Sequence, residues 1–338
     1  IKVNKFGETT YPELLISLAK LNQANCEGVV IDLRGNTGGY MGAAIQMVNE
    51  FLPKNRLIVY TQGRKSPREN YTSNGTGSSQ KMPIVVLMDE GSASASEIFA
   101  GAIQDNDRGT IIGRRSFGKG LVQQPIDFSD GSAIRLTIAR YYTPSGRCIQ
   151  KPYVKGNDAN YEMDILTRYE HGEFFSQDSI KQDQSQIFET SLGRPVYGGG
   201  GIMPDVFIPV DTTRYTDYHR KLVASGLVNR VSMNYLDRNR NQMMAKYPKF
   251  QQYKQDFVVG EDIMEELLKM AGDEKIEFEE EQYNCSKPLI MLQIKALIAR
   301  DLYDMAEYFQ VINDDNESFQ EALRLINDEQ RYKKELGR

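Results

Sequence analysis

Histidine and cysteine are scarce in this sequence. The 338 residues include two histidines, His171 and His219, each alone in a polar stretch that we expect to be exposed. Chemistry built on histidine metal ligands or on a histidine base is therefore disfavoured. The three cysteines, Cys26, Cys148 and Cys285, are odd in number and far apart. This spacing argues against a disulfide framework and against a cysteine-based zinc site.

Long apolar runs and an excess of positive charge are also missing. No uninterrupted apolar stretch approaches the roughly 18 residues of a membrane-spanning helix. The 41 Lys and Arg against 46 Asp and Glu give a net charge of −5, which offers no field for binding nucleic acid or an anionic membrane. The length predicts about two globular domains. Because the chain opens on Ile1 without a Met, we expect a piece of a longer product.

The first 150 residues alternate between strand-like and helix-like segments. Helices are expected from residue 10, after the Gly-rich turn 34–39, and after the small-residue turn 91–96. Residues 62–80 are dense in Gly, Ser, Asn and Pro and predict a mobile surface loop. The expected strands are 2–6, 28–33, 57–60, 83–88, 110–113 and 132–142. Strands that alternate with helices predict an α/β core.

The second half of the chain differs from the first in composition and in the spacing of its apolar residues. Residues 152–190 are polar and weakly periodic and predict an inserted excursion, before strand character returns at 202–210. Residues 211–338 predict a helical second domain, with helices at 261–270, 289–312 and 319–326. The segment 289–312 carries one broad apolar stripe: Leu289, Leu292, Ala296, Ala299, Leu302, Met305 and Phe309. We expect this stripe to pack within the chain; the alternative is a self-association surface.

Two short patterns suggest chemistry but lack the context that the chemistry needs. Residues 113–119 fit the G-x-x-x-x-G-K pattern of a phosphate-binding loop, but Gly120 stands where that loop needs a Ser or Thr. Residues 121–125 also predict a strand instead of the required helix. The S-x-x-K pattern of penicillin-recognising enzymes occurs at 17–20 and 116–119, without the S-D-N or K-T-G partner motifs. Both interpretations are disfavoured.

A serine-rich turn at residues 89–97 follows a buried-type strand and opens a helix. In α/β folds such a turn can present a nucleophile, and the first N–H groups of the helix can stabilise an oxyanion. With so few histidines, the base would have to be Lys, Asp or Glu, and a lysine can serve when burial keeps it neutral. Lys119 lies between two glycines in a bend that could bury it.

Five motifs occur in the order expected of one family. They are residues 31–39 (IDLRGNTGG), 91–97 (GSASASE), 116–123 (SFGKGLVQ), 142–150 (YTPSGRCIQ) and 200–205 (GGIMPD). Together they resemble the C-terminal processing peptidases, also called tail-specific proteases. The resemblance covers about residues 1–210, and five ordered motifs are more specific than any one of them.

The resemblance implies an α/β fold with a crotonase-like (ClpP/crotonase-type) peptidase core over residues 1–210 and a Ser/Lys dyad. Ser94 would be the nucleophile and Lys119, 25 residues later, the general base. Gln123 would position the lysine, since strand alternation puts positions 119, 121 and 123 on one face. Glu97 could support the site, although a favourable charge at a helix N-terminus explains it equally well.

The resemblance also implies an oxyanion hole. The backbone N–H groups of Ala95 and of Gly38 or Gly39 would form it, because glycine lets the backbone approach the substrate carbonyl. Ser92 and Ser96 are the fallback nucleophiles, although small polar turn residues of this kind are more often structural.

The implied function is that of a serine endopeptidase that cuts exported proteins at or near their C-terminal tails through an acyl-enzyme. The implied location is the periplasm or cell envelope, the implied partners are proteins or peptides with accessible C-termini, and no metal or organic cofactor is implied. Assembly as a homo-oligomer through the C-terminal helices is a further expectation. The upstream PDZ domain usual in this family is not visible in residues 1–338. The alternative is a latent or non-catalytic scaffold that binds unfolded tails and assembles through its helical domain.

Overall fold

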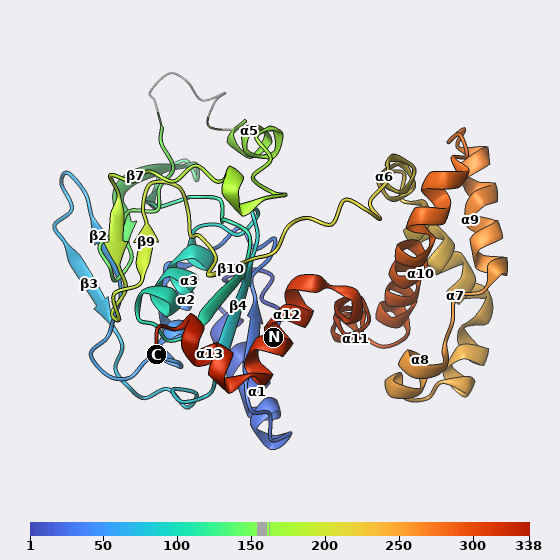
Figure 1. The fold of residues 1–338 in the computed structure, drawn as a ribbon, viewed down its shortest axis with the longest axis horizontal. Helices are drawn as coiled ribbons and strands as arrows, with labels where there is room; N and C mark the ends of the chain where they lie inside the picture. The colour runs from blue at the N-terminus through green and yellow to red at the C-terminus, as the bar shows by residue number, and fades with distance from the viewer. Residues whose placement is uncertain (154–160, 162) are drawn as a thin grey trace. The chain divides into compact units, whose positions relative to one another are not determined.

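The computed structural model describes residues 1–153, 161 and 163–338, and it divides into two compact units (Figure 1). Unit 1 comprises Ile1–Pro209 together with Glu321–Arg338, and unit 2 comprises Val210–Gln320. Each unit has its own apolar core. Among the described residues, no helix has both the length and the apolarity that a membrane span requires.

A parallel four-stranded sheet forms the centre of unit 1. Its strand order is β1 (Val29–Asp32), β4 (Ile84–Met88), β5 (Thr110–Gly113) and β10 (Val206–Phe207). Strands β1, β4 and β5 are buried at every position, as their continuous apolar sequences predict for a sheet covered on both faces. The helices that follow the predicted turns are α1 (Thr10–Gln23), α2 (Met41–Asn49) and α3 (Ala95–Asp105). The predicted strands at 2–6 and 202–210 are shorter: isolated bridges at Lys2 and Phe6, and the two residues of β10.

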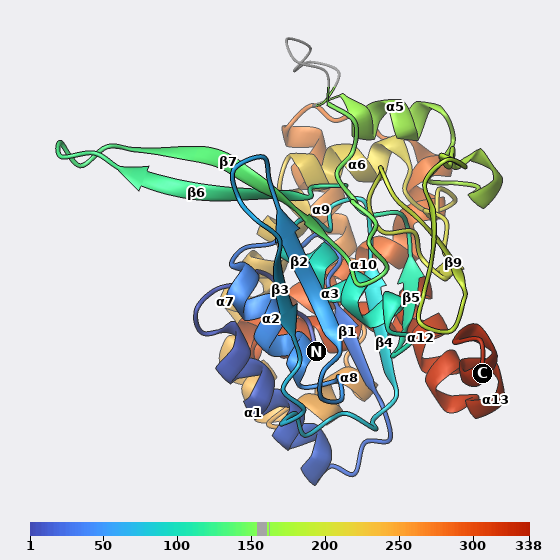
Figure 2. The same ribbon diagram turned by 90° about the vertical axis from the view of Figure 1, so that its left-hand side faces the viewer.

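A second sheet is antiparallel, in the order β3 (Glu69–Thr72), β2 (Leu57–Gln62), β7 (Ala133–Tyr142) and β6 (Leu121–Asp127). Strand β3 corrects the prediction of a mobile surface loop at 62–80. Pairing with β2 provides hydrogen-bond partners for its backbone N–H and C=O groups, and the local sequence does not reveal such long-range pairing. Helix α3 contacts both β5 of the first sheet and β2 of the second. Strands β6 and β7 form a long hairpin that extends away from the rest of unit 1 (Figure 2).

The predicted excursion at 152–190 contains helix α5 (Asp164–Glu170), the 3₁₀ turn η1 (Gln177–Ser179) and strand β8 (Ile187–Glu189), which pairs with β9 (Pro195–Tyr197). Residues 154–160 and 162 of that stretch lie outside the described residues. Near the C-terminus, α12 (Glu317–Asn327) and α13 (Glu329–Glu335) follow.

The C-terminal residues 321–338 belong to unit 1, whereas the sequence places them in the helical domain 211–338. The Tyr332 hydroxyl accepts a hydrogen bond from Ile84 N and donates one to Ile84 O, each 3.0 Å long, at the start of β4. Arg338 also donates to Asp107 O at 2.9 Å. A helix-period pattern predicts that one face is buried but not which core buries it, so this boundary needed the tertiary structure.

Unit 2 is helical. It contains α6 (Asp217–Ala224), α7 (Leu227–Lys246), α8 (Phe250–Asp256), α9 (Glu261–Asp273), α10 (Glu280–Leu302), α11 (Met305–Ile312) and the turn η2 (Asn313–Asp315). The single helix predicted at 289–312 is two helices, because the Asp304 side chain accepts a hydrogen bond from Met305 N and caps α11. Of the predicted stripe, Ala296, Ala299 and Leu302 are buried in the core of this unit, and Leu292 packs against that core. Leu289 is also buried. Intramolecular packing therefore accounts for most of the stripe, while Met305 remains exposed.

His219 is buried in unit 2, which corrects the expectation that both histidines are exposed. Its side chain faces Gln293, whose Oε1 lies 3.0 Å from Nε2, and its ring packs edge-on against Tyr215. Thr216 caps the helix that carries His219, so a polar local sequence coexists with a buried ring. His171 is exposed, as predicted.

Candidate active site

Ser94 occupies a tight turn between β4 and α3. It has φ 57° and ψ −114°, a backbone conformation that residues with a Cβ rarely adopt. Such strain persists only where surrounding contacts enforce it, and it is a recurring feature of functional sites. A strand, a sharp turn with a strained serine and then a helix is also the arrangement that exposes the nucleophile in α/β hydrolases.

The two fallback serines are held by main-chain hydrogen bonds. Ser92 Oγ donates to Leu33 O at 2.8 Å, and Ser96 Oγ donates to Asn36 O at 2.8 Å. Both side chains are buried, whereas Ser94 is half-buried. In this structure the Ser92 and Ser96 side chains therefore stabilise the turn through these hydrogen bonds.

A buried carboxylate joins the Ser94 turn to the Lys119 loop. Glu97, on the first turn of α3, is completely buried. Its Oε2 accepts hydrogen bonds from Ser94 N at 2.7 Å and Lys119 N at 2.8 Å. Its Oε1 accepts from Ser116 Oγ at 2.5 Å and Gly118 N at 2.7 Å. Burial raises the pKa of Glu97, and these four hydrogen bonds oppose that rise. The carboxylate therefore holds the Ser94 turn and the Lys119 loop together, although Glu97 and Lys119 are 22 residues apart in sequence.

Tyr141 is a site residue that the sequence analysis missed. Its hydroxyl donates a hydrogen bond to Lys119 O. Burial, together with the nearby Glu97 charge, raises the pKa of Tyr141 well above its usual value. The available signal was its position beside the motif at 142–150, on a strand that pairs with the Lys119 segment. Among the described residues, no hydrogen bond joins Ser94 Oγ to Lys119 Nζ in this structure.

The predicted oxyanion glycines lie against the Ser94 turn. A Cβ on Gly38 would come within 2.7 Å of Ser94 Cβ and 2.9 Å of Ala95 N, so only glycine allows this approach. The Gly38 N–H donates to Asn36 Oδ1 at 2.9 Å. By contrast, no described residue accepts a hydrogen bond from Ala95 N or Gly39 N. Ala95 N belongs to the first turn of α3, where helix N–H groups lack intrahelical partners.

A cleft of about 1010 Å³ opens beside Lys119, which is half-buried at its edge. Leu121 and Gln123 line the same cleft. The pairing of β6 with β7 shifts register between Val122 and Gln123, which places Gln123 opposite Thr137. Gln150 also lines the cleft, and its Oε1 accepts from Gly120 N at 2.8 Å.

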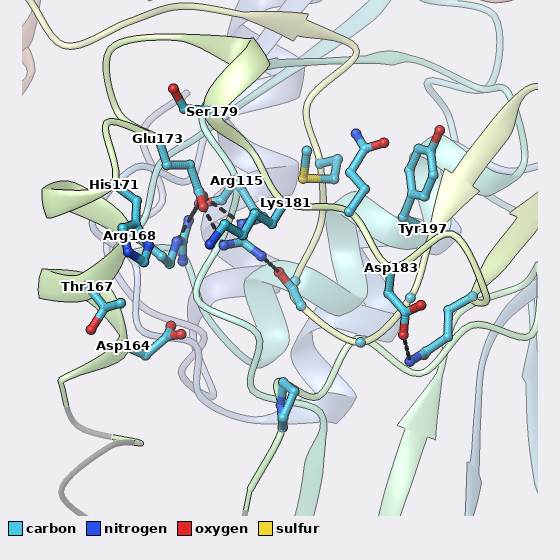
Figure 3. Close-up of a pocket in the computed structure, with 18 residues that line it drawn as sticks. Arg115, Asp164, Thr167, Arg168, His171, Glu173, Ser179, Lys181, Asp183 and Tyr197 are labelled. Atoms are coloured by element: carbon cyan, nitrogen blue, oxygen red, sulfur yellow. Dashed lines mark hydrogen bonds and ion pairs between the residues drawn. The ribbon is translucent and has the colours of Figure 1, made fainter.

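A second pocket, of about 480 Å³, lies where the excursion meets the loop before Lys119 (Figure 3). Arg115 and Arg168 both bind the buried Glu173 there, and the three side chains point toward one another in the close-up (Figure 3). Arg168 also donates to Ser116 O at 3.0 Å and to Arg115 O at 2.7 Å. Helix α5 is thereby tied to the loop that carries Lys119.

The structure does not support the two disfavoured motifs. Residues after Gly120 form strand β6, so no helix N-terminus follows the phosphate-loop pattern. Ser17 lies within α1, and its Oγ donates to Glu13 O of the same helix.

Residues 1–159 match the model of peptidase family S41, and 24 curated relatives match the chain. The carboxyl-terminal-processing protease of Synechocystis is 42% identical over 151 residues, 45% of this chain and 35% of that protein. Residues 1–159 are thus similar to peptidase family S41. The resemblance drawn from the five motifs is therefore confirmed.

Other relatives of the S41 segment carry similar names. The carboxy-terminal processing protease CtpB of Bacillus subtilis is 38% identical over 167 residues, 49% of this chain and 35% of that protein. A solved photosystem II D1 C-terminal processing protease is 36% identical over 44% of this chain and 38% of its own, with a TM-score of 0.41. The matched region spans about a third of each curated relative. Residues 218–304, in unit 2, match a family of unknown function (DUF8443).

Proposed function

We propose that this chain is a serine endopeptidase in which Ser94 is the nucleophile and Lys119 the general base. The observation that carries the proposal is the buried Glu97 carboxylate, which accepts from the backbone N–H of both residues. Two further observations support this assignment. The Ser94 backbone is strained, and no described residue accepts a hydrogen bond from the Ala95 N–H. A crotonase-like core is the fold we propose for unit 1, supported by its two separate sheets with α3 in contact with both.

The proposed reaction is acyl transfer to Ser94. Lys119 Nζ, as the base, takes the Ser94 proton as Oγ bonds to the peptide carbonyl carbon, and the N–H groups of Ala95 and Gly39 hold the oxyanion. We assign this role to Gly39 because the Gly38 N–H is engaged by Asn36. When the C–N bond breaks, Lys119 returns the proton to the leaving amine; water then cleaves the ester with Lys119 again as base. Gln123 lines the same cleft and would orient the lysine.

The Ser94 hydroxyl is not aligned with Lys119 in this structure. Among the described residues no hydrogen bond joins Ser94 Oγ to Lys119 Nζ, so the hydroxyl must turn toward the lysine before the proton can move. Catalytic hydrogen bonds are often formed only in the substrate complex. We further propose exported proteins cut near their C-terminal tails in the periplasm or cell envelope as the substrates, which the names of the S41 relatives support.

The test compares the Ser94/Lys119 pair with Ser17 and Lys20 of the S-x-x-K pattern in α1. Ser94→Ala and Lys119→Met are each expected to reduce kcat for peptide hydrolysis by about 10⁴-fold or more, because each removes a reacting group. The matched control is Ser17→Ala with Lys20→Met, an identical chemical change in the S-x-x-K pattern of α1, which should leave kcat unchanged. Cleavage is measured by mass spectrometry on unstructured polypeptides. If the Ser94→Ala variant hydrolyses peptides as fast as the wild type, the assignment is wrong. If the wild type hydrolyses no peptide, the latent scaffold is favoured.

A further inference from the structure

The cleft beside Lys119 is cationic. Three of the described residues that line it, Arg64, Lys119 and Arg140, carry positive charge, and none of the described lining residues is an Asp or Glu. The whole chain has a net charge of −5, so this concentration of one sign is local to the cleft and not a property of the protein surface. Like charges that line a concave site concentrate the opposite charge within it.

The two arginines are available for a ligand. Among the described residues, neither Arg64 nor Arg140 has an ion-pair or hydrogen-bond partner, and both side chains are exposed. Their neighbour Arg68 shows the contrast: it donates to Asn70 at 2.8 Å and stacks over the Tyr60 ring at 3.7 Å. A guanidinium left open in a cleft retains its five donors for a carboxylate, which it binds in a bidentate manner.

The register of the second sheet sets how far Arg140 lies from the proposed chemistry. Arg140, on β7, pairs with Leu121 of β6 and with Gln62 of β2, and both of these partners also line the cleft. Leu121 is two residues after Lys119, a separation of at most about 7 Å along the chain. An extended peptide advances by about 3.3 Å per residue. A substrate group bound at Arg140 would therefore lie about two residues from the bond that is cut.

We propose that this cleft selects substrates that carry a carboxylate within about two residues of the scissile bond, with Arg140 and Arg64 as the specificity-determining residues. The proposal rests on the peptidase function above and names the substrate chemistry of that site. Gln62, Gln123 and Thr137 add neutral donors to the same lining. The carboxylate can come from an Asp or Glu side chain or from the C-terminal α-carboxyl group, which offer the same planar acceptor to a guanidinium.

Peptide pairs that differ in one charge test the proposal on the full chain. The first pair carries Glu or Gln two residues from the mapped cleavage site, and the second pair ends in a free acid or an amide at that distance. We expect about a tenfold higher kcat/KM for the charged member of a pair, mostly through KM, because a charge-assisted hydrogen bond contributes to binding. The preference should shrink as salt is raised. Which pair shows the preference identifies the source of the carboxylate.

The variant Arg64→Gln/Arg140→Gln should bring the charged and neutral peptides to within about twofold of each other, by removing the guanidinium donors. The control is Arg135→Gln, the same charge change on β7 outside the cleft lining, which should keep the wild-type preference. Equal kcat/KM for both members of each pair in the wild type would overturn the proposal. So would a double variant that slows charged and neutral peptides equally.

Binding to Ser94→Ala separates this proposal from the peptidase assignment. Fluorescence anisotropy with labelled Glu and Gln peptides measures affinity without turnover. A preference for the Glu or free-acid peptide that disappears in Ser94→Ala/Arg64→Gln/Arg140→Gln supports carboxylate selection even if hydrolysis is absent. Equal affinity for all four peptides contradicts it, whether or not the wild type cleaves them.

Discussion

A single carboxylate organises the residues of the proposed site. Glu97 offers two oxygens to four donors, and three of these donors are backbone N–H groups that cannot find water in the buried interior. A glutamine at this position would have one acceptor oxygen, and its NH₂ group would face some of the N–H groups that now donate to Glu97. Glu97 therefore acts as a positioning residue for the Ser94 turn and the Lys119 loop.

Glu97→Gln is expected to lower kcat by about 100-fold and the free energy of unfolding by about 2–4 kcal/mol, since buried donors lose their charged acceptor. KM should change little, because Glu97 is completely buried and cannot contact the substrate. Peptide kinetics and urea unfolding provide the two readouts. Glu90→Gln, the same change at a partly exposed ion pair with Arg114, is the control. An unchanged kcat in Glu97→Gln would show that the two motifs stay in place without this carboxylate.

At the scale of elements, helix α5 stabilises the Lys119 loop. Arg168 of α5 reaches the carbonyl oxygens of Arg115 and Ser116, and the Glu173 carboxylate holds Arg168 and Arg115 together (Figure 3). Ser116 in turn donates to Glu97. The excursion is thus two contacts away from the carboxylate that positions Ser94.

Arg168→Gln should reduce kcat by about tenfold and the free energy of unfolding by about 1–3 kcal/mol, because two carbonyl groups lose their buried donors. The free energy of unfolding should not fall further, because Glu173 keeps its ion pair with Arg115. Leu166→Ala, at an exposed position of α5, is the control for a general disturbance of this helix. Steady-state kinetics with thermal unfolding is the measurement; a Leu166→Ala effect as large as that of Arg168→Gln would contradict the proposed coupling.

At the scale of the molecule, the C-terminal residues 321–338 pack in unit 1, the unit that also contains the N-terminal residues. Tyr332 binds both backbone groups of Ile84, the first residue of β4, and β4 leads directly to the Ser94 turn. Removing the hydroxyl leaves a buried N–H and C=O without that partner. Tyr332→Phe is therefore expected to lower the free energy of unfolding by about 1–3 kcal/mol.

Tyr40→Phe, which removes a hydroxyl from an exposed side chain, should leave the unfolding midpoint unchanged and serves as the control. Truncation after residue 320 should destabilise unit 1 more than Tyr332→Phe does, since it also removes the Arg338 contact with Asp107 O. Urea unfolding followed by circular dichroism measures both. A truncated chain as stable as the full one would show that residues 321–338 contribute nothing to unit 1.

Local sequence determined a large part of this structure. Continuous apolar runs predicted β1, β4 and β5, and turn residues followed by helical periodicity predicted α2 and α3, because these signals depend on near neighbours in the chain. The motifs also named Ser94 and Lys119 as the proposed catalytic pair. The same motifs predicted the resemblance to C-terminal processing peptidases, which the match of residues 1–159 to the S41 family model confirms.

The tertiary structure decided the contacts between segments distant in sequence. Glu97 was ambiguous from sequence because a carboxylate in a first helical turn needs no partner beyond the helix itself. Tyr141, Arg168 and Arg140 had no local signature, since their roles depend on strand pairing and on loops brought together by folding. The assignment of Tyr332 to unit 1 had the same origin: an amphipathic helix records that one face is buried, and only packing determines which core it meets.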